Sequence, residues 1–469
     1  MLPHAPRLSS RALRTVCPRL ATVLTLALAG CATYHPRPLG EGRGAASVAQ
    51  LAAPVKDFAG IPRNHRFDPS DGLDVTEVAT LAVANSPALK VQRDALGIAR
   101  AQAFAAGLLP DPQLSLGQDF PTPAGPGLTS AFTLGLSTDL TALLTRSSRV
   151  AAARGQARQV NLDLLWAEWQ TVAQARLLFD QVATLRAQST RLDAELAALT
   201  PVAVHIRTAL DQGNLTYDAA SIGLNAQADV RKRLADTEVA LHQADADLHR
   251  LLGLAPDAPL TLVGPAYTTA PTAAQVQRAL AELPRRRPDL LALQAGYASQ
   301  EASLRAAVLA QFPALNIGFN RARDTGGIYT KGYSLGISLP LFDRNRGNIA
   351  IARATRQQLR DDYAARVLAT RTDIERLRSD LITLDRQRAS LAAHARRLAR
   401  ASLAARHAWQ ARELDWPTYL AIRNNTLTAE LDLLAVRQQQ ATEAIALQAL
   451  LGNTDLAIPP SASAKASTP

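Results

Sequence analysis

Apolar and small polar residues alternate in two pairs of short segments along this chain. In the first segment Leu114 and Leu116 alternate with Ser115 and Gly117, and the other three segments repeat the pattern. A period of two residues, with one apolar and one small polar face, is typical of a half-buried strand. About ten residues is also the length of a tilted strand that crosses a membrane. The pattern therefore predicts strands at about 112–120, 131–140, 313–320 and 332–341.

A helical pattern follows each pair of strands and is longer than a compact domain requires. The two segments cover about 142–212 and 346–413, and each would span roughly 100 Å at 1.5 Å per residue. Polar breaks end both segments, and a second helical pattern then runs back to Leu252 in the first case and to Leu451 in the second. We therefore expect two pairs of long antiparallel helices.

Apolar residues in the second long segment are separated alternately by three and four positions. Ile374, Leu377 and Leu381 belong to this series. A period of 3.5 residues is typical of supercoiled helices that pack side by side. In the first long segment we expect Pro201 to kink the helix or to end it locally.

The strands and helices form two copies of one unit. Pro87 and Gly135 recur 201 positions later, as Pro288 and Gly336, with matching residue classes around them. Ser86 is placed to cap a helix that begins at Pro87. The duplication predicts a first repeat at 72–253 and a second repeat at 273–452. The composition predicts an extended segment at 31–71, a proline-containing linker at 254–272 and a flexible tail at 453–469.

Four strands are too few to close a barrel by themselves. The smallest common membrane barrels have about eight strands, and an open sheet edge in lipid leaves backbone groups unsatisfied at several kcal/mol each. If these strands enter a membrane, several chains must contribute to one barrel. The alternative is a soluble pair of hairpins on a coiled-coil rod.

The first 30 residues have the layout of an export signal, with arginines followed by an apolar run from Leu20 to Ala29. The run ends in Ala29, Gly30 and Cys31, which resembles the lipobox of bacterial lipoproteins. We therefore expect a signal peptide at 1–30 and a lipid (diacylglycerol and palmitate) on Cys31. A plain secretory signal with an incidental cysteine is the alternative. The predicted signal peptide and lipid anchor favour strands that enter a membrane over a soluble pair of hairpins.

The chain carries a net charge of +11. Part of the excess lies in the leader, and the remaining arginines are interspersed with acidic residues along helix faces. Since no basic stripe is interleaved with aromatic residues, we expect no nucleic-acid partner. There is no glycine-rich phosphate loop and no zinc-ligand spacing. His242 and His249 are seven residues apart, which is more typical of a packed or solvated face than of a metal site. We expect no enzyme activity, metal or cofactor.

The chain resembles the TolC-like outer-membrane efflux protein family in two stretches of each copy. These are residues 85–89 and 112–116 in the first copy and residues 287–290 and 313–318 in the second. The resemblance covers nearly all of 72–452, and Cys31 fits the lipoprotein branch of the family. It implies a homotrimer with a twelve-stranded β-barrel in the bacterial outer membrane and a long α-helical barrel that extends into the periplasm.

The resemblance also implies a function and partners. Such proteins are passive outer-membrane channels of tripartite efflux pumps, joined to a periplasmic adaptor and an inner-membrane transporter. Residues 287–317 and 337–347 are similar to members that work with transporters of the resistance-nodulation type. A duct for type I polypeptide secretion is an alternative, and a lipid-anchored periplasmic scaffold without a pore is another.

Members of this family meet the adaptor at the turns between their long helices. Some members close the channel there with two aspartates, whose positions correspond to Tyr419 and Ile422 here. The nearest carboxylate beside the first turn is Asp218, so Asp218 and Tyr419 are the candidates for a periplasmic gate. In our alignment of the copies Gly213 corresponds to Glu413. The predicted adaptor contacts are Gly213, Asn214, Leu215, Thr216, Glu413, Leu414, Asp415 and Trp416.

Overall fold

The structure is a computed structural model that describes residues 34–40, 42–52, 68, 71–122, 125–264 and 270–452. The chain divides into two compact units, one up to Arg43 and one from Gly44. The described part of the first unit contains no helix or strand. The predicted signal peptide, the lipidation site Cys31 and the tail 453–469 lie outside the described residues.

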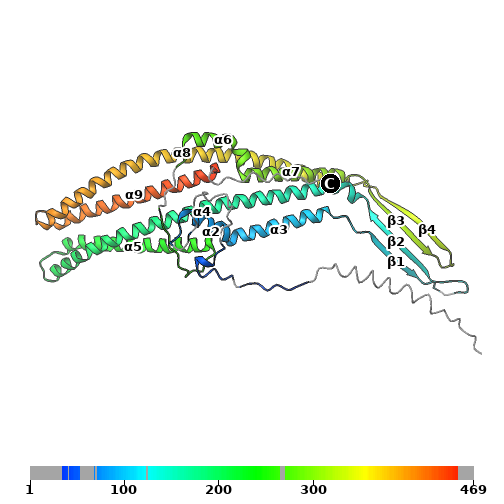
Figure 1. Ribbon diagram of the computed structural model, residues 1–469, viewed down its shortest axis with the longest axis horizontal. Helices are drawn as coiled ribbons and strands as arrows, with labels where there is room; N and C mark the ends of the chain where they lie inside the picture. Colours follow the sequence, from blue (N-terminus) through cyan, green and yellow to red (C-terminus); the bar gives the residue numbers. More distant parts are fainter. Residues whose placement is uncertain are drawn as a thin grey trace, which may run out of the picture. The chain divides into compact units, whose positions relative to one another are not determined.

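The unit from Gly44 is mostly helical and carries one four-stranded sheet, as Figure 1 shows. This confirms the expected mixture of long helices and strands. The first half comprises η1 (Val48–Gln50), α2 (Val75–Asn85), α3 (Pro87–Gly107), β1 (Gln113–Asp119), β2 (Ala131–Asp139), α4 (Thr141–Asp211) and α5 (Tyr217–Leu252). The second half comprises α6 (Ala273–Arg286), α7 (Pro288–Leu309), β3 (Ala314–Arg323), β4 (Tyr329–Ser338), α8 (Arg346–Gln410) and α9 (Trp416–Leu451).

The sheet is antiparallel throughout, in the order β1-β2-β3-β4. Leu114 pairs with Leu136 in the first hairpin, and Leu315 pairs with Ile337 in the second, so both hairpins have the same register at an offset of 201 residues. The backbone thus repeats with the same offset as the sequence.

The second hairpin differs from its predicted bounds. The strand β3 continues to Arg323 and β4 already begins at Tyr329, so the turn is shorter than expected. Backbone pairing does not need the apolar alternation, and it continues until the Asp324 carboxylate accepts a hydrogen bond from Ile328 N at 2.9 Å. The strand β4 ends at Ser338 rather than near 341, just before Pro340, which has no N–H to donate.

Two local predictions about the helices need correction. The helix α4 is continuous through Pro201, so this proline does not end it. Leu199, two residues before this proline, packs against α5 and α9, and such packing offsets the roughly 3 kcal/mol cost of an internal proline. The helix α3 begins at Pro87 with Ser86 as its N-cap residue, as expected, but the Ser86 side chain makes no capping hydrogen bond. Ser86 is buried and also ends α2, donating from its N–H to Ala82 O at 2.8 Å.

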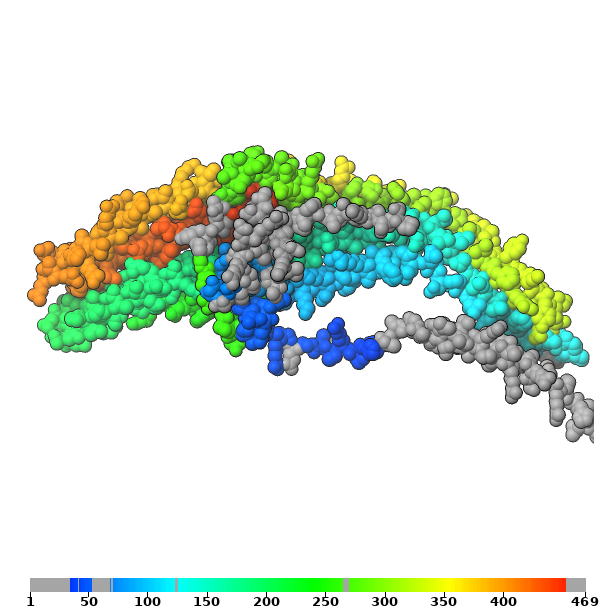
Figure 2. Space-filling view, viewed as in Figure 1, coloured from blue at the N-terminus to red at the C-terminus, as the bar shows by residue number. Residues whose placement is uncertain are grey.

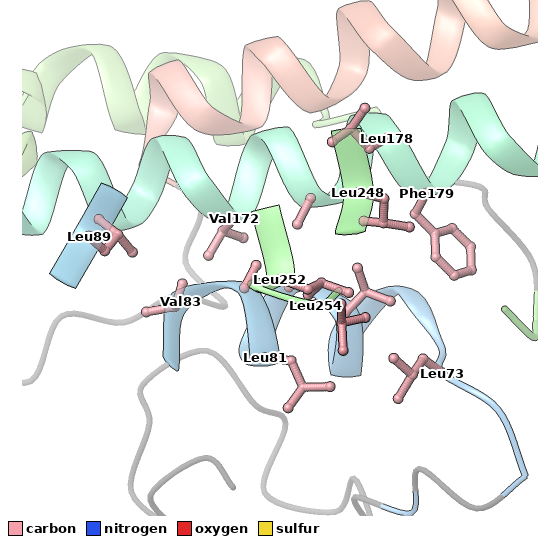
Figure 3. Close-up of a cluster of buried hydrophobic side chains, with 14 of the residues drawn as sticks. Leu73, Leu81, Val83, Leu89, Val172, Leu178, Phe179, Leu248, Leu252 and Leu254 are labelled. Atoms are coloured by element: carbon pink, nitrogen blue, oxygen red, sulfur yellow. The ribbon is translucent and has the colours of Figure 1, made fainter. Parts of the chain in front are cut away.

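The core consists of several clusters along the helices rather than one centre. Around α2, α4 and α5 the cluster includes Leu81, Phe179 and Leu248 (Figure 3). In the second half the predicted seam residues Ile374, Leu377 and Leu381 are buried between α8 and its neighbours. A further cluster lies near the helix turns and draws on both halves of the chain, including Leu199 from α4 and Leu427 from α9. The long helices are thus fixed side by side.

Candidate functional sites at the sheet and the helix turns

One face of the sheet is apolar across all four strands. Leu114, Leu136, Phe319 and Tyr333 lie opposite one another in consecutive strands. Because cross-strand partners share a face, these side chains form one continuous row, and Tyr333 is 90 % exposed. An apolar surface of this extent signals a surface that something apolar covers.

The opposite face carries small polar residues. Ser115, Gly135, Asn320 and Gly332 form the corresponding row. A Cβ at Gly135 would lie 2.4 Å from the Ser115 hydroxyl oxygen, so a side chain there would require this hydroxyl to turn away. The sheet is therefore apolar on one side and polar on the other, as a transmembrane β-barrel wall requires.

The sheet also has two open edges within the described residues, since β1 and β4 each pair with only one strand. Open edges present rows of backbone donors and acceptors to another strand. In a membrane these groups would have to be paired.

The two helix turns have the same backbone geometry. Gly213 adopts φ +73° in the first turn and Arg412 adopts φ +62° in the second. The next residues, Asn214 and Glu413, donate their N–H groups to carbonyls five residues earlier at 2.8 Å in both cases. The structural counterpart of Gly213 is therefore Arg412 and not Glu413, because two residues have been lost between the strands and this turn.

The predicted adaptor contacts fall into two groups. Five of them are exposed, namely Gly213, Asn214, Thr216, Glu413 and Asp415. Thr216 and Asp415 also start α5 and α9 as caps, accepting from Ala219 N and Thr418 N respectively. The hydrogen bond from Thr418 lowers the pKa of the Asp415 carboxyl.

The other three predicted contacts, Leu215, Leu414 and Trp416, are half-buried. Trp416 packs beside Gly223 of α5, where an added Cβ would lie 3.0 Å from the indole ring. Leu215 and Trp416 line a cavity of about 730 Å³ between the two hairpins. Leu414 and Trp416 also pack against the cluster of both halves near the turns, so they help to hold the two hairpins together.

The two candidate gate residues differ in exposure. Asp218 is exposed in the first turn of α5, whereas Tyr419 is 4 % exposed. The Tyr419 ring stacks on Trp409 at 4.8 Å between ring centroids, and its hydroxyl accepts a hydrogen bond from Arg423 at 2.9 Å.

An ion-pair network that the sequence analysis missed joins the two halves of the chain beside these turns. The Arg423 guanidinium donates two hydrogen bonds to the Glu195 carboxylate, at 2.8 and 2.6 Å. Arg191 pairs with Glu430 and lies 3.6 Å from Glu195. Burial penalises an unpaired charge, but Glu195 holds the pKa of Arg423 above its ordinary value. The only signal in the sequence was charged residues interrupting an apolar helix face.

The same long helix also carries a buried carboxylate, that of Asp180. Asp180 is 4 % exposed, and its Oδ2 atom has no hydrogen-bond partner among the described residues. Burial raises the pKa of Asp180 to about 6. In the part of the chain that the structure describes, no group of three or more metal-ligand side chains occurs, and no described helix is long and apolar enough to cross a membrane.

The fold is that of solved outer-membrane channels. The structure of CusC superimposes with a TM-score of 0.68 at 17% identity, covering 90% of this chain and 99% of CusC. A membrane protein from Pseudomonas aeruginosa gives 0.70 at 18%, covering 90% and 99%, and the CmeC outer membrane channel of Campylobacter jejuni gives 0.69 at 14%, covering 90% and 95%. No curated protein sequence matches the chain.

The family match comes from the sequence itself. Residues 278–453, which are nearly all of the second repeat, match the family described as outer membrane efflux protein. This match confirms the resemblance stated from the sequence for the second repeat, and the chain has the fold of solved outer-membrane channels.

Proposed function

We propose that this chain is the outer-membrane channel of a tripartite efflux pump and that three copies form one passive duct. The observation that carries the proposal is the sheet, which has one apolar face, one small polar face and two open edges. Three such sheets joined edge to edge make a twelve-stranded barrel with lipid outside and water inside, and no edge remains unpaired.

The helices continue this duct on the periplasmic side. In Figure 1 the sheet lies at one end of the long helices and the turns between these helices lie at the other end. The helix α4 packs side by side with α5 and α9, and α8 packs with α9, so the long helices of each chain form one segment of a wall. Three segments would enclose a tube.

We place the adaptor contact at the two turns, which lie side by side at one end in Figure 2. The exposed polar residues Asn214, Thr216, Glu413 and Asp415 supply the contact surface, and Trp416 supports it from beneath. The inner-membrane partner is a transporter of the resistance-nodulation type. A lipid on Cys31 would anchor the chain to the outer membrane.

Asp218 and Tyr419 have different roles in the proposed periplasmic gate. Asp218 is exposed and can line an opening, whereas Tyr419 is buried against Trp409 and acts by holding the Arg423–Glu195 pair between the hairpins. The gate would open when the two hairpins separate at this pair.

The test uses substitutions on opposite faces of the same strand. In β2, Leu136 lies on the apolar face and Thr133 on the polar face. An arginine in contact with lipid costs about 2–4 kcal/mol near the membrane midplane. In a strain that lacks this gene but expresses the pump partners, Leu136→Arg should fail to restore resistance to pump substrates or to reach the outer membrane. Thr133→Arg should still assemble there.

The opposite ranking, or equal assembly of both variants, would refute the barrel. If both assemble correctly in the outer membrane but no toxic compound or metal is exported, the type I secretion duct becomes the better function, and the export of a polypeptide in the same strain tests it. A chain that never forms a pore in a planar bilayer would instead support the periplasmic scaffold.

A further inference from the structure

Basic side chains gather on the apolar face of the sheet, near the hairpin turns. Arg321 and Lys331 lie directly opposite each other in β3 and β4. The next row toward the turns contains Arg323, which pairs with Tyr329 on one side and with Phe132 on the other. Near the turns, the apolar face thus ends in a row with two basic residues and a row in which one arginine lies between two aromatic residues.

The chain does not neutralise Arg321 and Lys331 itself. Like charges directly opposite each other destabilise a sheet, and neither residue forms an ion pair within the described residues. The nearby carboxylates are used elsewhere, because Asp119 is on the polar face and Asp324 accepts a hydrogen bond from Ile328 N in the turn.

A neighbouring copy would not neutralise them either. The strand next to β4 in a closed barrel is β1 of another copy, whose residues on the apolar face are Leu114, Leu116 and Gln118. The loop after β1, residues 120–130, contains no aspartate or glutamate. If this face contacts lipid, an anion that pairs with these two charges would therefore come from outside the protein.

Neighbouring groups fix the position of the Arg323 side chain near the same end of the sheet. Its guanidinium lies 5.8 Å from the Phe132 ring centroid and 5.9 Å from that of Tyr329, and it donates to Ser130 O at 2.7 Å. Stacked arginine keeps its charge while its planar faces stay in contact with apolar groups. Such a group suits a ligand that is anionic at one end and apolar at the other.

We propose that Arg321, Lys331 and Arg323 bind the phosphate groups of an anionic lipid in the outer leaflet of the membrane. The inference rests on the proposed function, since it takes the apolar face as the lipid contact and the hairpin turns as the outer end. The ligand is a lipid rather than free phosphate because Leu116 and Leu134 continue the rows beside the charges and are exposed to acyl chains.

The experiment measures lipid binding to the purified full-length protein by native mass spectrometry after delipidation. The probe is lipid A with two phosphates, compared with its dephosphorylated form and with inorganic phosphate. The double variant Arg321→Gln/Lys331→Gln removes the two opposed charges. The control Arg353→Gln/Arg360→Gln removes two exposed charges from α8.

We expect the wild type and the control to bind the phosphorylated lipid at least about tenfold more tightly than the double variant does. Dephosphorylated lipid and inorganic phosphate should not discriminate between the proteins. Equal lipid binding by the double variant, or equal competition by free phosphate, would overturn the inference. Fractionation of the same preparations distinguishes failure of the lipid site from failure of the proposed function. A trimer that is found in the outer membrane but does not bind the lipid phosphates refutes the lipid site alone.

Discussion

Asp180 provides a quantitative test of how the long helices are packed. Its carboxyl is buried, lacks a partner on Oδ2 and has a pKa of about 6 instead of 3.8. A difference of about two pKa units corresponds to roughly 3 kcal/mol at about 1.4 kcal/mol per unit. Ionised Asp180 therefore destabilises the folded chain by up to about 3 kcal/mol.

The sign of the pH dependence follows from linkage. The folded-state pKa lies above the unfolded value, so the folded chain holds this proton more tightly. Below pH 3.8 both states are protonated and the cost is absent. The free energy of unfolding then falls as the pH rises from about 4 to 6, and the full cost remains above pH 6.

The substitution Asp180→Asn should remove this cost, because an amide carries no charge at any pH. Thermal unfolding followed by circular dichroism should show a higher midpoint than wild type at pH 7.5, and nearly equal midpoints at pH 4. The matched control is Asp193→Asn, which changes an exposed carboxyl on the same helix and should shift neither midpoint by much. A variant that is no more stable than wild type at pH 7.5, or equally stabilised at both pH values, would refute the assignment.

Four further substitutions test the contacts between the copies and the turns. Glu195→Gln removes the partner of Arg423 and should lower the free energy of unfolding by about 3–5 kcal/mol, as measured by denaturant unfolding. Gly213→Ala should destabilise the first turn by about 1 kcal/mol, while Arg412→Gly should stabilise the second by a similar amount, since both positions have positive φ. Arg287→Lys should destabilise the chain, because lysine cannot make the two parallel hydrogen bonds that the buried Arg287 guanidinium donates to the Asp289 carboxylate. The Arg287 guanidinium also lies over the Trp166 ring, so near-ultraviolet circular dichroism should report the altered environment of Trp166.

Each of these has a clear contrary outcome. A loss from Glu195→Gln no greater than that from breaking the exposed Lys232–Asp236 pair would show that the network contributes little. If Gly213→Ala did not lower the free energy of unfolding, or if Arg412→Gly did not raise it, the left-handed backbone at these positions would be contradicted. An unchanged tryptophan signal in Arg287→Lys would contradict the 4.8 Å stacking of Arg287 on Trp166.

The alternation of side chains predicted the sheet well because it reflects which face each residue occupies. Leu136 and Thr133 lie on the faces that the period of two requires. The bounds of β3 and β4 were less accurate, since backbone pairing through Arg323 and Tyr329 leaves no trace in hydrophobicity.

Contacts between distant residues were beyond the sequence pattern. Glu195 and Arg423 are 228 residues apart, and nothing local in either helix identifies its partner. The burial of Tyr419 likewise depends on the stacked ring of Trp409 in another helix. The side-chain hydrogen bond expected of Ser86 is missing for a related reason. Ser86 ends α2 as well as preceding α3, so its conformation depends on both helices.

The number of copies in the assembled channel tests the central claim most directly. Native mass spectrometry of the protein extracted from outer membranes should give a mass three times that of the processed chain. The account predicts this trimer because one chain supplies four strands and leaves two open edges. A monomer that is stable and membrane-embedded would contradict it, since its sheet edges would then remain unpaired in lipid.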